Sequence, residues 1–292
     1  MPAEDGSESR LRVRKTYKLA IGGAFPRSES GRSYPVEDSS GALLAQAAQA
    51  SRKDVRDAVV AARKAFPGWA AATAYNRGQV IYRVAEMLEG RREQFAAEVA
   101  AAEGGTADAA LGSVDDSIDR IVWYAGWADK FAQVAGSANP IAGPYFNFSV
   151  PEPTGVVAIL APQESSLLGF VSVLAPVLCT GNTAVIVASE RRPLPAVSLS
   201  EVLATSDLPG GVVNVLTGFT SELAPWLASH RDVNAIDLTG VAAGDRADLQ
   251  RAAADNVKRV YIPAGEDWTD EPGTARLTAF VETKTVWHPI GV

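Results

Sequence analysis

The chain has 292 residues, of which 47% are hydrophobic, and its formal net charge at pH 7 is −7. This length and composition allow a substantial core in one large domain or two. The negative charge argues against nucleic acid or an anionic membrane as the main partner, because a phosphate-binding surface needs clustered Lys and Arg.

Cysteine usage and hydropathy limit the location of the protein. The single cysteine, Cys179, excludes an internal disulfide framework and fits a reducing compartment. No apolar run reaches the roughly 20 residues needed to cross a bilayer, and the N-terminus lacks a charged-then-apolar signal sequence. We therefore expect a cytoplasmic protein with no membrane partner.

The N-terminal part begins with a polar, charged stretch. Residues 1–16 are expected to form a flexible arm, because they contain too few apolar residues to pack. The segment 17–21 is predicted to start a strand that turns at Gly22 and Gly23, with residues 33–36 as the return strand.

A helical region follows. Ser51 and Asp54 resemble a capping box at the start of a helix that Pro67 and Gly68 are expected to end. Apolar residues then recur at helical spacing, which predicts three more helices. These cover residues 75–90, 91–103 and 114–134.

Two segments are predicted as strands with open edges. Residues 144–150 alternate, with Phe146, Phe148 and Val150 on one face, which indicates a half-buried strand. Residues 277–287 are rich in β-formers. Because an open strand edge invites pairing with another chain, we expect both segments to take part in oligomerisation.

The centre of the chain alternates between short apolar runs and helix-length segments. Its strands are predicted at 154–161, 182–188, 211–217, 233–239 and 257–262. The first three are near-continuous Val, Ile, Leu and Ala runs, which is typical of parallel strands covered on both faces. The fifth alternates more and is expected toward an edge.

The four segments between these strands carry helix boundary signals. Ser165 and Ser166 precede the first apolar run, and Pro193 opens the second. In the third, Leu223, Trp226 and Leu227 are expected to face inward, and the fourth covers residues 245–254. The order predicts an α/β fold with a doubly wound parallel sheet and right-handed crossovers.

Four sequence segments carry a family resemblance. They are Glu-Pro-Thr-Gly-Val-Val-Ala-Ile at 152–159, the helix and strand of 174–186, Leu-Pro-Gly-Gly-Val-Val-Asn-Val-Leu-Thr-Gly at 208–218, and 228–233. Together they resemble the nucleotide-binding half of aldehyde dehydrogenases, and residues 21–23, 65–69 and 280–287 are similar to that family's opening and closing elements. A weaker likeness is to the second module of two-module members (family 16).

The resemblance implies a Rossmann-type fold, NAD(P)-dependent oxidation of aldehydes, and oligomers formed through strands. It divides the chain into the arm 1–16, a dinucleotide-binding-type domain of 17–138 plus 152–264, and oligomerisation strands at 139–151 plus 277–292. In the family, a whole catalytic domain lies between the fifth strand and the closing strand. Here only residues 265–276 intervene, as a linker.

The residues that the family uses for catalysis are replaced. Glu164 stands where the family has its oxyanion-holding Asn, and Pro263 falls in the segment of the general-base Glu. Losing one oxyanion donor costs about 3 kcal/mol of transition-state stabilisation, and a carboxylate about 4 Å from the developing alkoxide adds a repulsion of about 4 kcal/mol. The nucleophilic Cys has no position, because in the family it lies in the catalytic domain that residues 265–276 replace. Cys179 does not take its place, since it lies within an apolar helix and is expected to be a structural thiol. We predict no catalytic residue.

The cofactor residues are also incomplete. Val187 replaces the ribose-binding Lys, which leaves Glu190, and Gly240 is followed by Val241 where the family has Gly-Ser. By resemblance, Glu190, Gly218 and Gly240 are the candidate cofactor-binding residues, and NAD or NADP binding is expected to be weak or absent. The alternative for Glu190 is a carboxylate favoured near the N-terminus of the helix that opens at Pro193.

Neither histidine has companions at ligand spacing, so no metal site is predicted. The first functional hypothesis is a catalytically inactive structural or regulatory subunit that pairs with itself or with a complete aldehyde dehydrogenase. The second is an NAD(P)-dependent oxidoreductase whose nucleophile comes from a partner chain. The third is a nucleotide sensor without catalysis.

Overall fold

The computed structural model describes residues 13–291, so most of the arm expected at 1–16 lies outside the described residues. Its centre is a five-stranded sheet in the order β10-β9-β6-β7-β8, with all neighbours parallel. The strands are β6 (Val156–Leu160), β7 (Thr183–Val187), β8 (Val213–Leu216), β9 (Ala235–Asp237) and β10 (Arg259–Tyr261). All five predicted strands are confirmed, and β10 lies at an edge as expected.

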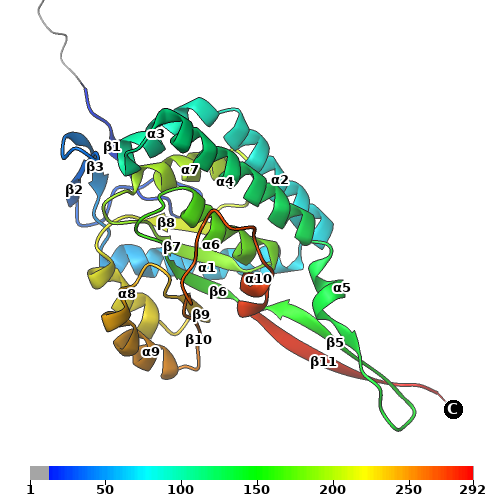
Figure 1. Ribbon diagram of the computed structural model, residues 1–292. Coiled ribbons are helices and arrows are strands. Elements are labelled where there is room, and N and C mark those ends of the chain that lie inside the picture. The colour runs from blue at the N-terminus through cyan, green and yellow to red at the C-terminus, as the bar shows by residue number, and fades with distance from the viewer. Residues whose placement is uncertain (1–12, 292) are drawn as a thin grey trace, which may run out of the picture.

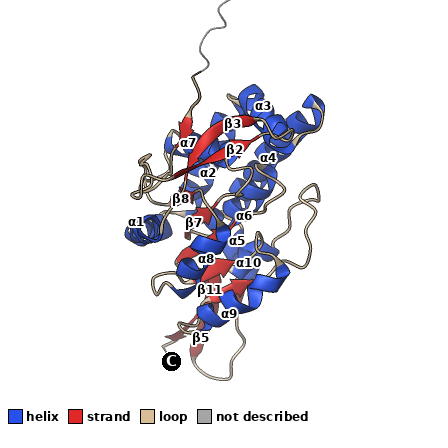
Figure 2. Cartoon of the chain, turned by 90° about the vertical axis from the view of Figure 1, so that its left-hand side faces the viewer, coloured by secondary structure: helices blue, strands red, loops and turns tan. Residues whose placement is uncertain are grey.

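Helices cover both faces of this sheet (Figure 2). The sequence dictates this because side chains alternate along each strand: Val157 and Ile159 face one layer, while Val156, Ala158 and Leu160 face the other. All five are completely buried. A strand buried on both sides reads as one apolar run, and that pattern identified β6 in the sequence.

The first helical layer is the larger of the two. It contains α2 (Ala74–Glu89), α3 (Arg92–Glu103), α4 (Ala107–Trp127), α6 (Leu168–Cys179) and α7 (Leu194–Ala204). The second layer contains α1 (Arg52–Ala71), α8 (Thr220–Ser229) and α9 (Arg246–Ala254), with the short 3-10 turn η1 (Ala243–Asp245) before α9. The predicted doubly wound α/β fold is confirmed.

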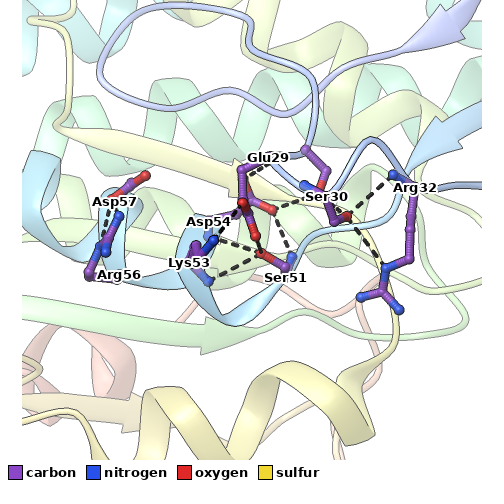
Figure 3. Close-up of polar contacts among 9 residues, drawn as sticks. Glu29, Ser30, Arg32, Ser51, Lys53, Asp54, Arg56 and Asp57 are labelled. Carbon is purple, nitrogen blue, oxygen red and sulfur yellow. Dashed lines mark hydrogen bonds and ion pairs between the residues drawn. The ribbon is translucent and has the colours of Figure 1, made fainter.

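The start of α1 is fixed by the predicted capping box (Figure 3). The Ser51 hydroxyl accepts hydrogen bonds from the backbone N–H groups of Lys53 and Asp54, and the Asp54 carboxylate accepts one from the Ser51 N–H at 2.7 Å. Asp54 also accepts from the Ser28 hydroxyl and the Glu29 N–H. This nearly buried carboxylate therefore connects α1 to the loop before β2.

Three helix predictions were wrong in detail. The first helix does not end at Pro67 but continues to Ala71, because its last turn buries Trp69, whose indole N–H donates to the Leu178 carbonyl at 3.2 Å. The expected helix 114–134 starts at Ala107, where Thr106 caps it, and is interrupted before α5 (Phe131–Ala135). Trp226 is exposed rather than inward and stacks on the Arg52 guanidinium.

A small N-terminal sheet was only partly predicted. It has the order β1-β3-β2, with β1 (Thr16–Tyr17), β2 (Ser33–Glu37) and β3 (Leu43–Ala48). The predicted strand at 17–21 is shorter than expected, and β3 was missed. Its sequence, Leu-Leu-Ala-Gln-Ala-Ala, is rich in alanine, a residue that is depleted in strands.

The third sheet has three strands, and two of them form a long ribbon that extends away from the body (Figure 1). In it β5 (Tyr145–Pro153) pairs antiparallel with β11 (Val281–Pro289), and the short β4 (Ser137–Ala138) pairs with the other edge of β5. The five-residue helix α10 (Ala275–Ala279) leads into β11. Both predicted strands exist, but the one expected at 277–287 begins only at Val281, because residues 277–279 belong to α10. Phe146 is exposed, while Phe148 and Val150 are partly buried.

No helix within residues 13–291 is both long enough and apolar enough to cross a membrane.

Candidate functional site at the carboxyl edge of the sheet

A cavity of about 480 Å³ opens beside the carboxyl ends of the central strands. Its walls come from the segments after β6, β7 and β9 and from α8 and α9. Open α/β sheets receive ligands at this edge, and the volume falls within the range of about 300–1,000 Å³ that is usual for small-molecule pockets. The cavity is lined by Gln163, Glu190, Thr220, Ser221, Ala224, Pro225, Gly240, Val241, Ala242, Asp245, Asp248 and Leu249.

Glu190 lies just beyond β7, where it supports the start of α8 and also lines the cavity. One oxygen of its carboxylate accepts a hydrogen bond from the Thr220 backbone N–H at 2.5 Å, at the first residue of α8. A carboxylate is stabilised there because the helix dipole and unpaired N–H groups are positive at this end. Its backbone N–H donates to the side-chain oxygen of Gln163 at 2.9 Å. Glu190 therefore supports α8, and not the helix that opens at Pro193, while it also lines the cavity.

The two candidate glycines lie in different surroundings. Gly240 lines the same cavity as Glu190, and a Cβ at this position would lie 1.9 Å from the Ala161 carbonyl oxygen. Only glycine allows the backbone after β9 to pass this close to β6. Gly218 is not among the lining residues; it packs against Ala50 with φ of 142°. The structure thus brings Glu190 and Gly240 together and leaves Gly218 outside.

The charges around the cavity decide which part of a dinucleotide fits. Three carboxylates line it, those of Glu190, Asp245 and Asp248, and no Lys or Arg is among the lining residues. The first N–H of α8, which would bind a phosphate, already donates to Glu190. The cavity has room for a nucleoside, but its charges do not fit the diphosphate of NAD or NADP.

The residue at the expected oxyanion position points to solvent. The Glu164 carboxylate is exposed and lies 3.2 Å from the Arg192 guanidinium, which also donates to the Glu164 carbonyl. The Glu164 carboxylate has only acceptor oxygens, so its side chain cannot donate a hydrogen bond to an oxyanion. This geometry provides no oxyanion donor at residue 164.

Cys179 ends α6 inside the core. It is 1% exposed, and burial raises the pKa of its thiol to about 12, although the nearby Arg77 guanidinium acts in the opposite direction. A thiol with such a pKa is protonated at neutral pH and is a poor nucleophile. The structure agrees with the interpretation of Cys179 as a structural thiol.

The linker 265–276 closes the sheet edge beside β9 and β10. Its last residue, Arg276, places one guanidinium nitrogen 2.5 Å from the carboxylate of Asp237, which is completely buried at the end of β9. The same guanidinium lies 2.6 Å from Glu266 and donates to the Thr239 hydroxyl. It also stacks over the Tyr261 ring at 4.4 Å. We call this group of residues the Arg276 cluster.

The ion pairs and hydrogen bonds of the Arg276 cluster hold the linker against the sheet. Burial pulls the pKa of Arg276 down, but Asp237 and Glu266 outweigh burial and raise it, so the cation persists. Burial raises the pKa of Asp237, which Arg276 and Thr239 only partly offset. Sequence reasoning missed this cluster, although an Asp inside an apolar strand signals a buried carboxylate that needs a partner.

No cluster of three or more potential metal ligands occurs among residues 13–291. His230 ends α8, where its ring nitrogen Nδ1 accepts from the Asp232 N–H at 3.2 Å and burial lowers its pKa. His288 lies in the exposed part of β11. The structure brings neither histidine to the cavity.

A doubly wound parallel sheet with a ligand-sized cavity at its carboxyl edge defines a Rossmann-type α/β protein. Residues 25–265 match the sequence profile of the Aldehyde dehydrogenase family. The chain is 30% identical over 270 residues to "Aldehyde dehydrogenase, cytosolic 1" of Elephantulus edwardii, covering 91% of this chain and 53% of that protein. It is 34% identical over 260 residues to "Retinal dehydrogenase 2" of Gallus gallus, covering 87% and 49%.

The fold gives the same result. The NAD+ complex of an aldehyde dehydrogenase from Bacillus cereus superposes with a TM-score of 0.77 at 28% identity, over 84% of this chain and 50% of that one. The chain therefore belongs to the aldehyde dehydrogenase family. It spans about half the length of the relatives that it matches.

Proposed function

We propose that this protein is an aldehyde dehydrogenase family subunit without aldehyde-oxidising activity of its own, which assembles with a second copy or with a complete aldehyde dehydrogenase. The observation that carries the proposal is the Arg276 cluster. Residues 265–276 run directly from the fifth strand of the sheet to the helix before β11, and the cluster binds them to β9. Residues 265–276 are thus packed against the edge of the sheet and do not form a loose loop.

The side chains near this edge support the loss of catalysis. Hydride-forming oxidation of an aldehyde needs an attacking nucleophile, a proton acceptor and a donor for the developing oxyanion. Cys179 is buried and protonated, Glu164 is an exposed carboxylate paired with Arg192, and Pro263 has no group that accepts a proton. Each of the three functions lacks a side chain that could perform it at these positions.

The ribbon supports assembly. One edge of β11 pairs with β5 over nine residue pairs, and its other edge has no partner strand within the described residues. Unpaired backbone N–H and C=O groups along such an edge are a template for another strand. Apolar side chains accompany it, since Trp287 is 60% exposed and Phe146 is 50% exposed. A second chain on this ribbon would cover both features.

Sedimentation analysis of the purified protein tests the assembly, alone and mixed with a purified full-length aldehyde dehydrogenase. The wild type is expected to form an oligomer or a mixed complex, and Phe146→Asp should weaken it strongly because the charge would be buried without a partner. Tyr75→Asp is the matched control, since Tyr75 is an exposed aromatic residue on α2, away from the ribbon. A wild-type monomer that binds no aldehyde dehydrogenase contradicts the proposal.

A second candidate function is sensing of a nucleoside or nucleotide. The cavity beside α8 and the free oxygen of Glu190 favour it, although the surrounding carboxylates disfavour a diphosphate. Melting temperatures with adenosine and with NAD+ test this candidate, because a ligand that binds only the folded state raises the transition. The sensor is contradicted if neither ligand at millimolar concentration shifts it.

The remaining alternative is an oxidoreductase with a nucleophile supplied by a partner chain. It requires that a mixture with a complete aldehyde dehydrogenase produce NADH faster than that enzyme alone. The cytoplasmic location expected from the single cysteine stays a prediction, which fractionation of cells would test.

A further inference from the structure

A second cavity lies under the linker, separate from the one that contains Glu190. It has a volume of about 210 Å³ and is bounded by α4, α6, the end of β10 and the linker. Its inner wall includes Arg120 and Tyr124 from α4 and Ser172 from α6, while residues of the linker, Trp268 among them, form its outer wall. Three of the wall residues, Arg276, Glu266 and Tyr261, also belong to the Arg276 cluster, and the proposed function does not use Arg120, Tyr124 or Ser172.

Arg120 is a buried cation without a carboxylate partner. It is 8% exposed, and its guanidinium donates only to neutral atoms, the Ser172 hydroxyl at 2.8 Å and the Asp270 carbonyl at 2.6 Å. Its Nε–H is buried with no acceptor. Within residues 13–291 no salt bridge joins it to an acidic side chain. A buried charge is normally paired, so this guanidinium has unused capacity for an anion.

Tyr124 provides a second unused donor on the same wall. It follows Arg120 by four residues on α4, so both side chains share one helix face. Tyr124 is 3% exposed and lines the cavity, yet its hydroxyl makes no hydrogen bond to any residue that the structure describes. Burial raises the pKa of Tyr124 to about 12, and this keeps the hydroxyl protonated as a donor at neutral pH.

We propose that the cavity under the linker binds a small monocarboxylate, whose oxygens accept hydrogen bonds from Arg120 and Tyr124. A planar guanidinium matches a carboxylate with two parallel N–H donors. The ring of Trp268 and Pro272 supply an apolar wall for a short substituent. The site requires no residue of the Glu190 cavity and is independent of whether the protein oligomerises.

The charge of the linker selects a monoanion over a dianion. Four carboxylates line the cavity: Asp267, Asp270 and Glu271 are exposed on the outer wall, and Glu266 is paired with Arg276. Both arginines of the lining are buried. Arg276 is already paired with Asp237 and Glu266, whereas Arg120 has no salt bridge among the described residues. The Arg120 guanidinium can therefore pair with one negative charge. A second negative charge would face the linker carboxylates without a cation, which disfavours inorganic phosphate.

The test uses sodium acetate as the probe with the intact chain. Binding is followed by saturation-transfer NMR on the acetate methyl protons and by Trp fluorescence, at ionic strength held constant with sodium chloride. Acetate is expected to saturate with a dissociation constant in the millimolar range, since a ligand of so few atoms reaches no higher affinity in most sites. Inorganic phosphate should compete more weakly than acetate.

Two variants and two controls assign the binding to this cavity. Tyr124→Phe removes one hydrogen bond and should weaken acetate about fivefold, and Arg120→Gln removes the charge-assisted bonds and should weaken it at least about tenfold. Tyr82→Phe and Arg83→Gln make the same substitutions at exposed positions of α2 and should leave the affinity unchanged. Tyr124→Phe removes a single unpartnered oxygen, so it keeps the test valid if Arg120→Gln does not fold.

Three outcomes overturn the proposal. They are the absence of saturable acetate binding, equal affinity in Tyr124→Phe and Tyr82→Phe, and tighter binding of phosphate than of acetate. The first two remove the site, and the third removes its preference for a single charge.

Discussion

The Arg276→Met substitution tests whether the linker is locked to the sheet. It removes the cation 2.5 Å from Asp237 and leaves a completely buried carboxylate behind. Removing one partner of a buried pair costs about 3–5 kcal/mol of unfolding free energy, because the remaining charge is uncompensated. We expect the lower end, about 3 kcal/mol, since the Thr239 N–H and hydroxyl still donate to Asp237.

Urea denaturation of the variant and two controls measures this cost. Arg259→Met breaks an exposed pair with Glu282 and should cost about 1 kcal/mol or less. The double substitution Asp237→Asn with Arg276→Met removes both charges and should recover most of the loss, because no buried ion remains.

The pH dependence of the stability of Arg276→Met gives a second test of this ion pair. Burial already raises the pKa of Asp237, and loss of Arg276 raises it more, so a protonated carboxyl is favoured in the folded variant. Stability linked to a raised pKa is present at low pH and is lost as pH rises through that pKa. The deficit of Arg276→Met should therefore be larger at pH 8 than at pH 5. A loss of unfolding free energy no greater than that of Arg259→Met, or no recovery in the double variant, shows that the Arg276–Asp237 pair does not hold the linker to the sheet.

Three further predictions follow from single groups. Hydrogen bonds from Arg259 lower the pKa of Glu282 from 4.5 to about 2. The contribution of the Arg259–Glu282 pair to the free energy of unfolding is therefore lost as pH falls from 4.5 toward 2. In acid unfolding, the stability of Arg259→Gln should depend less on pH in that window. Cys179 should react with a thiol reagent only as fast as the protein unfolds, and rapid labelling of the native chain contradicts its burial. Gly240→Ala should destabilise by about 1–3 kcal/mol in urea denaturation, because its Cβ would meet the Ala161 carbonyl; an unchanged midpoint shows that the backbone yields there.

The central sheet was predictable because each strand is buried on both sides. A run such as Val156–Leu160 needs neither alternation nor long-range information to be identified, and its buried neighbours on both faces explain the pattern. The same local reasoning missed β3, whose alanines fit a helix as well as a strand. In the structure β3 lies between β1 and β2, and those neighbours decide its conformation.

The candidate site was predictable only in part. Position after a strand was enough to place Glu190 and Gly240 at the sheet edge, where both line one cavity. Sequence could not show that α8 would occupy one oxygen of Glu190, nor that Arg276 would reach Asp237 from 39 residues away. Such partners depend on how loops cross the end of the sheet, and local patterns do not encode that. The single Asp within β9 was the available signal.

The most direct test of the central claim is aldehyde-dependent NADH production by the purified chain alone. We expect no NADH above the rate without protein, with aliphatic and aromatic aldehydes and with either NAD+ or NADP+, and no change in Cys179→Ala. A rate proportional to protein concentration, abolished by Glu190→Ala and retained in Cys179→Ala, contradicts it and shows that this chain performs the oxidation with a different set of residues.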